Sequence, residues 1–245
     1  MHAPTCCPVL ELRQYTLKPG LRDVLIELFE REFIESQEAL GITLVGQFRD
    51  LDNPDRFVWL RGFSDMTTRA QALQEFYGGP IWKAHREAAN ETMIDSDNVL
   101  LLRPARPTSG FSLENAARQP PGATENPRGL IVATICHLRD GAGDDFADFF
   151  ERVMKPALAK ADASPIASFV TENHPNTFPA LPIRENVNVF AWFSIFPDES
   201  AHAHHTAILA DSPHWKNIAE ELAGRLAEPP EILRLRPTPR SRLHA

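Results

Sequence analysis

The stretch "WKAHREAAN" at residues 82–90 returns as "WKNIAEELA" at residues 215–223, 133 positions further along the chain. The same offset of 133 relates Trp59 to Trp192, far outside the two quoted stretches. A constant spacing between matching residues is the signature of an internal repeat, in which one structural unit occurs twice. The sequence therefore predicts two copies of the same fold in one chain.

Nearer the start of each copy the offset is 121, as from Phe48 to Phe169. The change from 121 to 133 means that the second copy carries 12 extra residues between its two alignable blocks. The extra residues fall in "ENHPNTFPALPIREN" at 172–186, where several prolines favour a loop.

Each copy predicts the same order of elements: strand, helix, two strands, helix and strand. Alternating apolar residues indicate the strands, and apolar residues at helical spacing indicate the helices. This order is the ferredoxin-like β-α-β-β-α-β unit and predicts an α+β protein. In the first copy the expected strands are 9–17, 42–50, 56–63 and 98–104, and the expected helices are 19–40 and 65–77, with a short helix restarting at 81–82.

A four-stranded sheet with both helices on one face leaves its other face uncovered, and that face needs a partner. Two copies in one chain satisfy each other, so we expect an intramolecular α+β barrel made of the two sheets. The predicted boundaries are 8–104 for the first unit, 105–128 for a proline-rich linker and 129–238 for the second unit.

Composition and charge limit the classes of function. The net charge of −8 argues against nucleic acid as a partner, and the arginines at 234, 236, 240 and 242 suggest a solvated C-terminal tail. Three cysteines provide no disulfide framework and favour a reducing compartment. The longest stretch without Asp, Glu, Lys or Arg has 12 residues, 186–197, too short to span a bilayer. With no signal-peptide pattern, we expect a soluble, cytoplasmic protein.

Three segments of the first copy carry a family resemblance: "ELRQYTLKPG" (11–20), "GQFRDLDNPDRFVWLRGF" (46–63) and "GGPIWKAHR" (78–86). Together they resemble the NIPSNAP family. The second copy is similar in its "SPHW" segment (212–215) but lacks the "ELR.Y" pattern. The resemblance implies a dimeric α+β-barrel fold, here completed within one chain, and it supplies no catalytic motif to carry over.

The strands of the first copy offer a candidate ligand site. Because side chains alternate along a strand, Glu11, Arg13 and Tyr15 share one face, and Trp59 and Arg61 share a face of the third strand. If the aliphatic faces pack on the helices, these five side chains point into the barrel. Two arginines beside aromatic rings suit an anionic or planar small molecule. The alternative is that Glu11 forms structural ion pairs with Arg13 or Arg61.

The repeated helix adds Trp82 and His85. In the second copy an apolar stripe along this helix must face inward, and Ile218 stands in it where the first copy has His85. We therefore expect His85 on a buried or half-buried face. It is either a core histidine satisfied by a hydrogen bond or a residue that contacts ligand. The stripe consists of Trp215, Ile218, Leu222 and Leu226.

Three histidines at 202, 204 and 205 raise the question of a metal. His202 and His205 share a helical face, but no Glu or Cys completes a recognised ligand set. We favour a solvated helix face over a metal site for His202, His204 and His205, and we predict no metal and no cofactor.

Three functions remain open. The preferred one is a small hydrophobic or anionic molecule bound in the barrel, with homo-oligomers possible through outer surfaces. The second is a cofactor-independent or haem-dependent oxygenase- or isomerase-type enzyme. The third is a structural or protein-interaction module, which a filled, dry interface with Arg61 paired to Glu11 would favour. The candidate ligand-binding residues are Arg13, Tyr15, Trp59, Arg61, Trp82 and His85.

Overall fold

The alternating and helical patterns of the sequence become strands and helices in the expected order in the computed structural model, which describes residues 5–114, 116–139 and 143–245. The first half contains β1 (Val9–Leu17), α1 (Arg22–Leu28), η1 (Phe29–Phe33), α2 (Ile34–Glu38), β2 (Thr43–Asp50), β3 (Arg56–Phe63), α3 (Met66–Gly78), α4 (Pro80–Thr92) and β4 (Met93–Pro104). The second half contains β5 (Leu130–His137), α5 (Gly143–Phe149), η2 (Phe150–Met154), α6 (Lys155–Lys160), β6 (Pro165–Thr171), β7 (Val189–Phe196), α7 (Glu199–Asp211), α8 (Pro213–Arg225) and β8 (Glu231–Pro237).

Local sequence explains where the helices begin and end. The Asp65 and Asp198 carboxylates accept hydrogen bonds from backbone N–H groups two or three residues into α3 and α7, at 2.7 and 2.8 Å, and so cap both helices. Proline stands at the first position of α4 and of α8, where its missing N–H costs no hydrogen bond. Gly41, with φ +80, ends the first helical segment in a left-handed turn.

The first helix of each half is interrupted at the same place. α1, η1 and α2 follow one another without a break, and η1 is a π-helical turn that begins at Phe29. The second half repeats this arrangement with η2, which begins at Phe150, 121 residues later. The offset read from the sequence therefore holds for the irregular helical turns as well as for the regular elements.

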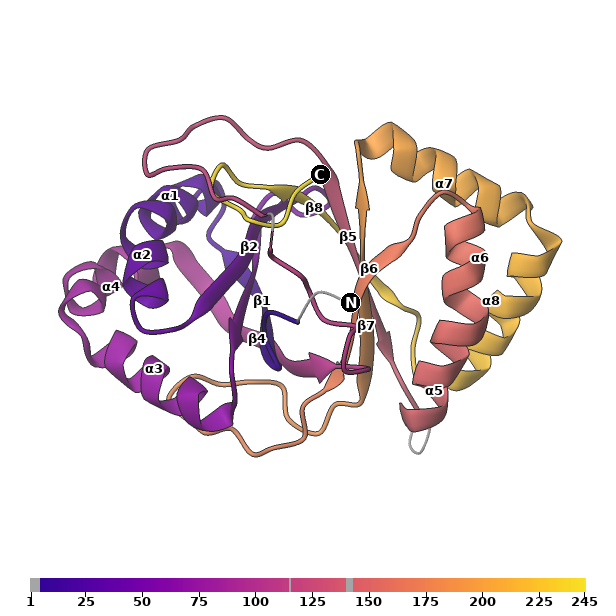
Figure 1. Ribbon diagram of the computed structural model, residues 1–245. Helices are drawn as coiled ribbons and strands as arrows, with labels where there is room; N and C mark the ends of the chain where they lie inside the picture. The colour runs from indigo at the N-terminus through magenta and orange to yellow at the C-terminus, as the bar shows by residue number, and fades with distance from the viewer. Residues whose placement is uncertain (1–4, 115, 140–142) are drawn as a thin grey trace.

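Eight strands close into a barrel in the order β1-β3-β2-β8-β5-β7-β6-β4. Each half contributes four antiparallel neighbours, and the two sheets join where β2 pairs with β8 and β4 pairs with β6. Figure 1 shows α1–α4 over the outer face of the first sheet and α5–α8 over the outer face of the second. The expected intramolecular α+β barrel is confirmed.

The barrel interior is an apolar core that both halves share. Leu10 and Leu12 of β1 lie in one cluster with Ile131 and Ala133 of β5 and Phe193 of β7. All five side chains are fully buried. The opposite faces of β1 and β3 instead lie under the helices of the first half, together with Phe29 and Phe33. The expectation that the polar faces point into the barrel is wrong.

The physical reason for this reversal lies in how the two sheets meet. Their aliphatic faces cover each other and exclude water from the core of the barrel. The polar residues are tolerated on the helix side because they pair with one another, as described below. The five side chains that face the helices and not the barrel interior are those of Glu11, Arg13, Tyr15, Trp59 and Arg61.

Segments outside the repeats complete the core. Cys7 near the N-terminus, Phe111 and Leu113 of the linker and Leu243 near the C-terminus all pack into the barrel cluster. Arg240 is only 2% exposed and its guanidinium donates to the Glu30 carbonyl oxygen at 2.5 Å. The C-terminal segment is therefore docked, and the expectation of a solvated tail is wrong for this arginine.

The inserted segment 172–186 lies across the first half, although it belongs to the second. The Glu172 N–H donates to the Leu101 carbonyl at 2.9 Å and the Arg184 N–H to the Val99 carbonyl at 2.8 Å, so both arms of the loop lie alongside β4. In Figure 1 this orange loop passes close to α3. The insertion therefore covers part of the first sheet and its helices.

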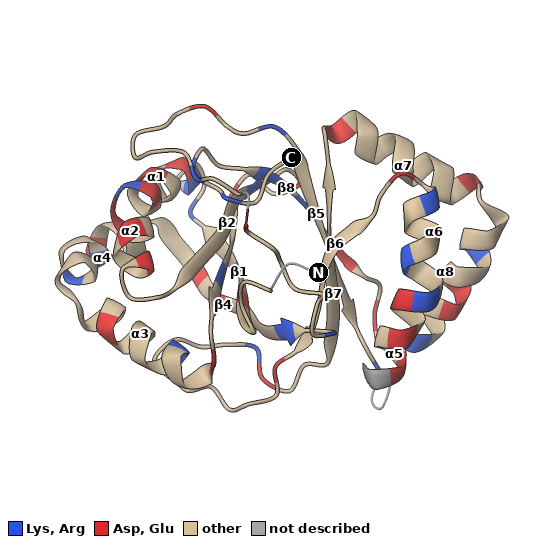
Figure 2. Ribbon diagram, in the orientation of Figure 1, with Lys and Arg blue, Asp and Glu red and all other residues tan. Residues whose placement is uncertain are grey.

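Charged residues of both signs are interspersed along α8, whereas those of α6 are lysines (Figure 2). Over the residues that the structure describes, none of the helices has the length and apolar character that crossing a membrane would need.

Candidate functional site

The Glu11 carboxylate lies at the centre of a buried cluster of three guanidinium groups. Its Oε2 accepts from Arg13 Nη1 and Arg61 Nε, both at 2.7 Å. Its Oε1 accepts from Arg69 Nε at 2.7 Å, and Arg69 Nη2 lies equally close to that oxygen. The side chains of all four residues are 0% exposed. Arg69 of α3 was not singled out in the sequence, although it completes the cluster.

Aromatic rings enclose the arginines. The Arg13 guanidinium lies 5.4 Å from the ring centroids of both Tyr15 and Trp59, and that of Arg61 lies 5.0 Å from the Trp59 centroid. Tyr15 and Trp59 meet edge to face at 5.7 Å, and the Tyr15 hydroxyl accepts from Arg13 Nε at 3.1 Å. Arg61 Nη1 donates to Gln37 Oε1 at 3.0 Å. Rings and guanidiniums thus hold each other in fixed positions.

The electrostatics of the cluster favour charged forms. Burial alone would raise the pKa of the Glu11 carboxyl, but the charges of Arg61, Arg13 and Arg69 outweigh burial and hold that pKa well below its ordinary value. Burial lowers the pKa of the Arg69 guanidinium, which its contact with Glu11 offsets only in part. Glu11 is therefore an ionised carboxylate at neutral pH.

The two candidates from α4 lie at different distances from this cluster. Trp82 is half-buried and packs edge to face against Tyr77, with ring centroids 4.9 Å apart. His85 is half-buried as expected, but its Nε2 lies 3.4 Å from Glu32 Oε2, and no contact with the described arginines of the cluster is found. The structure therefore brings Trp82 to the site and leaves His85 outside it.

A small cavity adjoins the cluster. It has a volume of about 30 Å³, enough for about two water molecules at ~10–15 Å³ each. Its polar lining comes from Tyr15, Gln37, Trp59 and Tyr77, and Trp82 closes one side. The space between the first sheet and its helices is therefore nearly filled.

The same space in the second half is open. A cavity of about 320 Å³ lies between the second sheet and helices α7 and α8. Among the residues that line it are the second-half counterparts, at offsets of 121 or 133, of the polar residues in the first half. These are Val132 for Glu11, Thr134 for Arg13, Leu158 for Gln37, Ser194 for Arg61 and His202 for Arg69.

Loss of side-chain volume explains the difference between the halves. Thr134 and Ser194 are much smaller than the two arginines they replace, and a large-to-small replacement leaves a void when the surroundings do not collapse. Trp192 and Trp215, the counterparts of Trp59 and Trp82, provide the aromatic walls. The replacement of Arg13 by Thr134 and of Arg61 by Ser194 is visible in the sequence, and the loss of side-chain volume that it causes predicts the cavity.

Two histidines lie in the wall of the open cavity. The His205 ring is buried, and its Nδ1 lies 2.6 Å from the Ala161 carbonyl oxygen, which fixes Nδ1 as the protonated nitrogen. His202 packs edge to face on Phe196 at 5.0 Å. Burial lowers the pKa of His202, and His205 and Arg234 lower it further. Both rings therefore differ from the solvated helix face that we expected.

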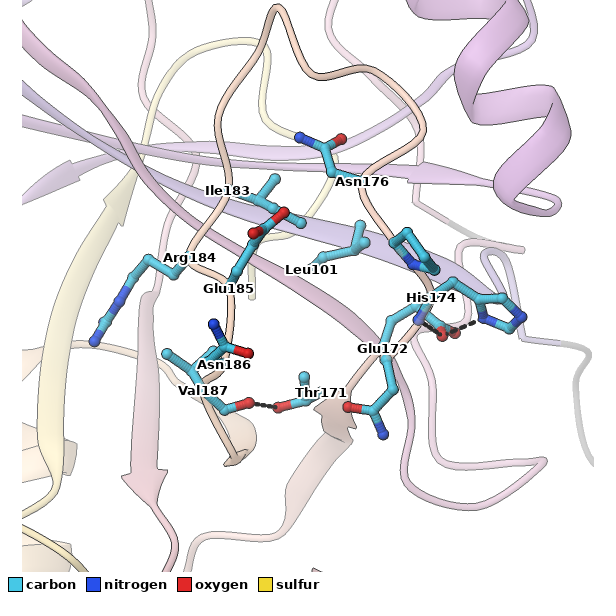
Figure 3. A pocket seen from close by; sticks show the side chains of 12 residues that line it. Leu101, Thr171, Glu172, His174, Asn176, Ile183, Arg184, Glu185, Asn186 and Val187 are labelled. Atoms are coloured by element: carbon cyan, nitrogen blue, oxygen red, sulfur yellow. Dashed lines mark hydrogen bonds and ion pairs between the residues drawn. The ribbon is translucent and has the colours of Figure 1, made fainter.

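A third hollow lies within the inserted loop and has a volume of about 310 Å³. Figure 3 shows its two sides formed by the arms of the loop, with Leu101 of β4 between them. Several of its polar groups are already bonded: Glu172 Oε1 lies 2.6 Å from His174 Nδ1, and Thr171 Oγ1 donates to the backbone carbonyl of Val187 at 3.1 Å. Because these polar groups are already partnered, the hollow is a weaker candidate.

Over residues 5–114, 116–139 and 143–245, no group of three or more His, Cys, Asp or Glu side chains is arranged to hold a metal ion.

Comparison with protein families gives one match. Residues 10–107 match the NIPSNAP family model. The first half of the chain therefore contains a segment similar to a NIPSNAP domain. This half contains the Glu11 cluster, whereas the open cavity lies in the second half, beyond the matched residues. A comparison with curated proteins finds no match.

Solved structures share the fold across the whole chain. A protein of Lactobacillus acidophilus NCFM, named "putative monooxygenase", is 14% identical, with a TM-score of 0.56 over 96% of this chain and 98% of its own. An "anthrone oxidase-like protein" is 12% identical, with a TM-score of 0.53 over 97% of this chain and 95% of its own. At these identities the likeness concerns the fold alone.

A NIPSNAP family protein of Agrobacterium tumefaciens with unknown function is 27% identical over 43% of this chain and 96% of its own, with a TM-score of 0.38.

Proposed function

We propose that this protein binds a small, flat, mostly apolar molecule in the cavity between the second sheet and helices α7 and α8. The observation that carries the proposal is the volume of about 320 Å³, which lies at the lower end of the range ~300–1,000 Å³ of ligand pockets. The proposal moves the ligand from the barrel interior, where apolar side chains fill the shared core, to the helix side of the sheet.

The lining of the cavity supports a particular ligand chemistry. Trp192, Trp215 and Leu158 offer aromatic and aliphatic walls, which suit an aromatic ring. Thr134, Ser194 and His202 offer a few hydroxyl and imidazole groups, which suit one or two polar substituents. We therefore expect an uncharged aromatic ketone or phenol to bind better than a sugar or a phosphate ester.

Ligand binding is tested by thermal stability and calorimetric titration with a panel of polycyclic aromatic ketones and phenols. Ala210 is exposed on α7 and lines the cavity, so Ala210→Trp should obstruct its mouth and weaken binding at least tenfold. Ala207→Trp is the matched control, because Ala207 is exposed on the same helix and does not line the cavity. Equal binding by both variants would remove the cavity from consideration.

A second candidate function is oxidation of such a ligand. Its specific support is His202, a cavity imidazole whose pKa burial lowers and which is therefore available as a neutral base. A base of this kind can take a proton from a methylene flanked by aromatic rings. The resulting carbanion reacts with O₂, so that CH₂ and O₂ give C=O and H₂O. The names of two fold neighbours, a "putative monooxygenase" and an "anthrone oxidase-like protein", are consistent with this chemistry.

Oxygen consumption with anthrone as the probe tests the second candidate. We expect turnover without added metal or flavin and its loss in His202→Gln, with binding retained. The absence of a cofactor, and a cytoplasmic location suggested by three free cysteines, remain part of the proposal.

A further inference from the structure

The Glu11 cluster carries more positive than negative charge. One carboxylate faces three guanidiniums, and all four side chains are fully buried. Arg69 has two further acceptors, Asn176 Oδ1 at 3.1 Å and Thr177 Oγ1 at 3.2 Å, but both are neutral. Two positive charges are therefore left without a counter-charge among the described residues. Buried charge of this kind is strongly unfavourable unless an anion compensates it.

Donor groups around the cluster lack acceptors. Arg13 Nη2, Arg61 Nη2 and Trp59 Nε1 are buried, and none of them has a hydrogen-bond partner in the described part of the chain. Buried polar groups are rarely left in this state, and each exception calls for a specific explanation. Three buried donor nitrogens without acceptors, beside an excess of positive charge, indicate an acceptor that carries negative charge.

Space for such an acceptor lies one side chain away from the arginines, neither of which lines it. The cavity of about 30 Å³ is lined by Tyr15 and Gln37, which are the direct hydrogen-bond partners of Arg13 and Arg61. A small rotation of either partner would open the cavity to the guanidiniums. Its volume limits the occupant to a few heavy atoms.

We infer that the Glu11 cluster is a binding site for a small oxyanion of the carboxylate or bicarbonate class, with Arg13 and Arg61 as its principal donors. The planar guanidinium matches the planar arrangement of oxygens in such an anion better than it matches a spherical halide. The site lies in the first half and is independent of the ligand cavity proposed for the second half, whose equivalent positions are neutral or apolar apart from His202.

The inserted loop closes this site. Asn176 and Thr177 bond to Arg69 on its outer side, and Phe178 stacks on Tyr77 with ring centroids 5.8 Å apart and planes at 20°. Because Tyr77 lines the small cavity, the loop stands between the cavity and solvent.

Differential scanning calorimetry tests the inference with the full chain in a buffer whose main anion is bulky gluconate. Formate and bicarbonate should raise the melting temperature in a saturable manner, and chloride at equal ionic strength should raise it less. Arg61→Gln should weaken formate binding at least tenfold. Arg234→Gln, which removes an arginine from a surface ion pair with Asp52, should not. Glu11→Gln should strengthen it at least threefold, because one more guanidinium charge is then uncompensated.

A measurement on the unmodified protein guards against variants that do not fold. The ¹³C resonance of labelled formate should broaden in the presence of the wild-type chain and sharpen again when unlabelled bicarbonate competes. Unchanged line widths, or a thermal shift as large with chloride as with formate, would overturn the inference.

Discussion

Arg61 of β3 and Ser194 of β7 occupy equivalent positions in the two halves of the barrel, and they leave their surroundings in opposite states. Arg61 is fully buried and bonded to Glu11 at 2.7 Å, within a nearly filled space. Ser194 lines a cavity of about 320 Å³. One architecture thus supports a closed polar cluster in one half and an open, mostly apolar pocket in the other.

Replacing Glu11 should strongly destabilise the fold. In Glu11→Gln the three buried guanidiniums lose the carboxylate that they share, and breaking a buried ion pair by removing one partner costs about 3–5 kcal/mol. Glu199→Gln is the control, because Glu199 pairs with Arg236 while half exposed, and exposed pairs contribute about 0–1 kcal/mol. Urea unfolding measures both free energies. Similar losses in the two variants would contradict a special role for the cluster.

The same carboxylate should set the response of stability to acid. Since the pKa of Glu11 is lower in the folded chain than in the unfolded one, its contribution is fully present above the unfolded pKa of about 4.3. The contribution is lost as pH falls from there toward the folded pKa. The stability difference between wild type and Glu11→Gln should therefore stay constant from pH 7 to about 5 and shrink at lower pH. A difference that grew on acidification would have the wrong sign.

His202 should affect the stability of the fold at higher pH values than Glu11 does. Its pKa in the folded chain is lowered by burial and by the neighbouring charges of His205 and Arg234, so the unfolded chain binds a proton first as pH falls. The contribution of neutral His202 is complete above the unfolded pKa of about 6.5 and declines as pH falls toward the folded value. Urea midpoints between pH 8 and pH 5 should fall less in His202→Gln than in wild type. His204→Gln, at an exposed neighbouring position, should follow wild type.

The architecture could be predicted from the sequence because the same pattern of strands and helices occurs in both halves of the chain. The offsets of 121 and 133 predicted both halves, and the uncovered sheet face of each ferredoxin-like unit predicted the closed barrel. Alternation also correctly grouped Glu11, Arg13 and Tyr15 on one face of β1. These inferences depend on periodicity, which local sequence determines.

The direction of that face could not be read in the same way. Alternation separates two faces but does not say which one meets the helices, and burying Arg13 and Arg61 under helices looked unfavourable for isolated charges. Part of the cost is offset by the Glu11 carboxylate, which also pairs with Arg69, 58 positions away in the sequence. The open cavity was missed for a related reason: it depends on the volume that Ser194 leaves empty, which only three-dimensional packing determines.

The stacking of Phe178 on Tyr77 should control how firmly the inserted loop is held. Phe178→Ala removes a half-buried ring that packs against the first-half core, so the loop should open more often at a loss of about 1–2 kcal/mol in global stability. Hydrogen exchange at the Glu172 and Arg184 N–H groups, which donate to β4, measures the opening directly. Asn173→Ala alters an exposed side chain of the same loop and should leave exchange unchanged. Equal protection in Phe178→Ala and wild type would mean that the backbone pairing with β4 alone closes the loop.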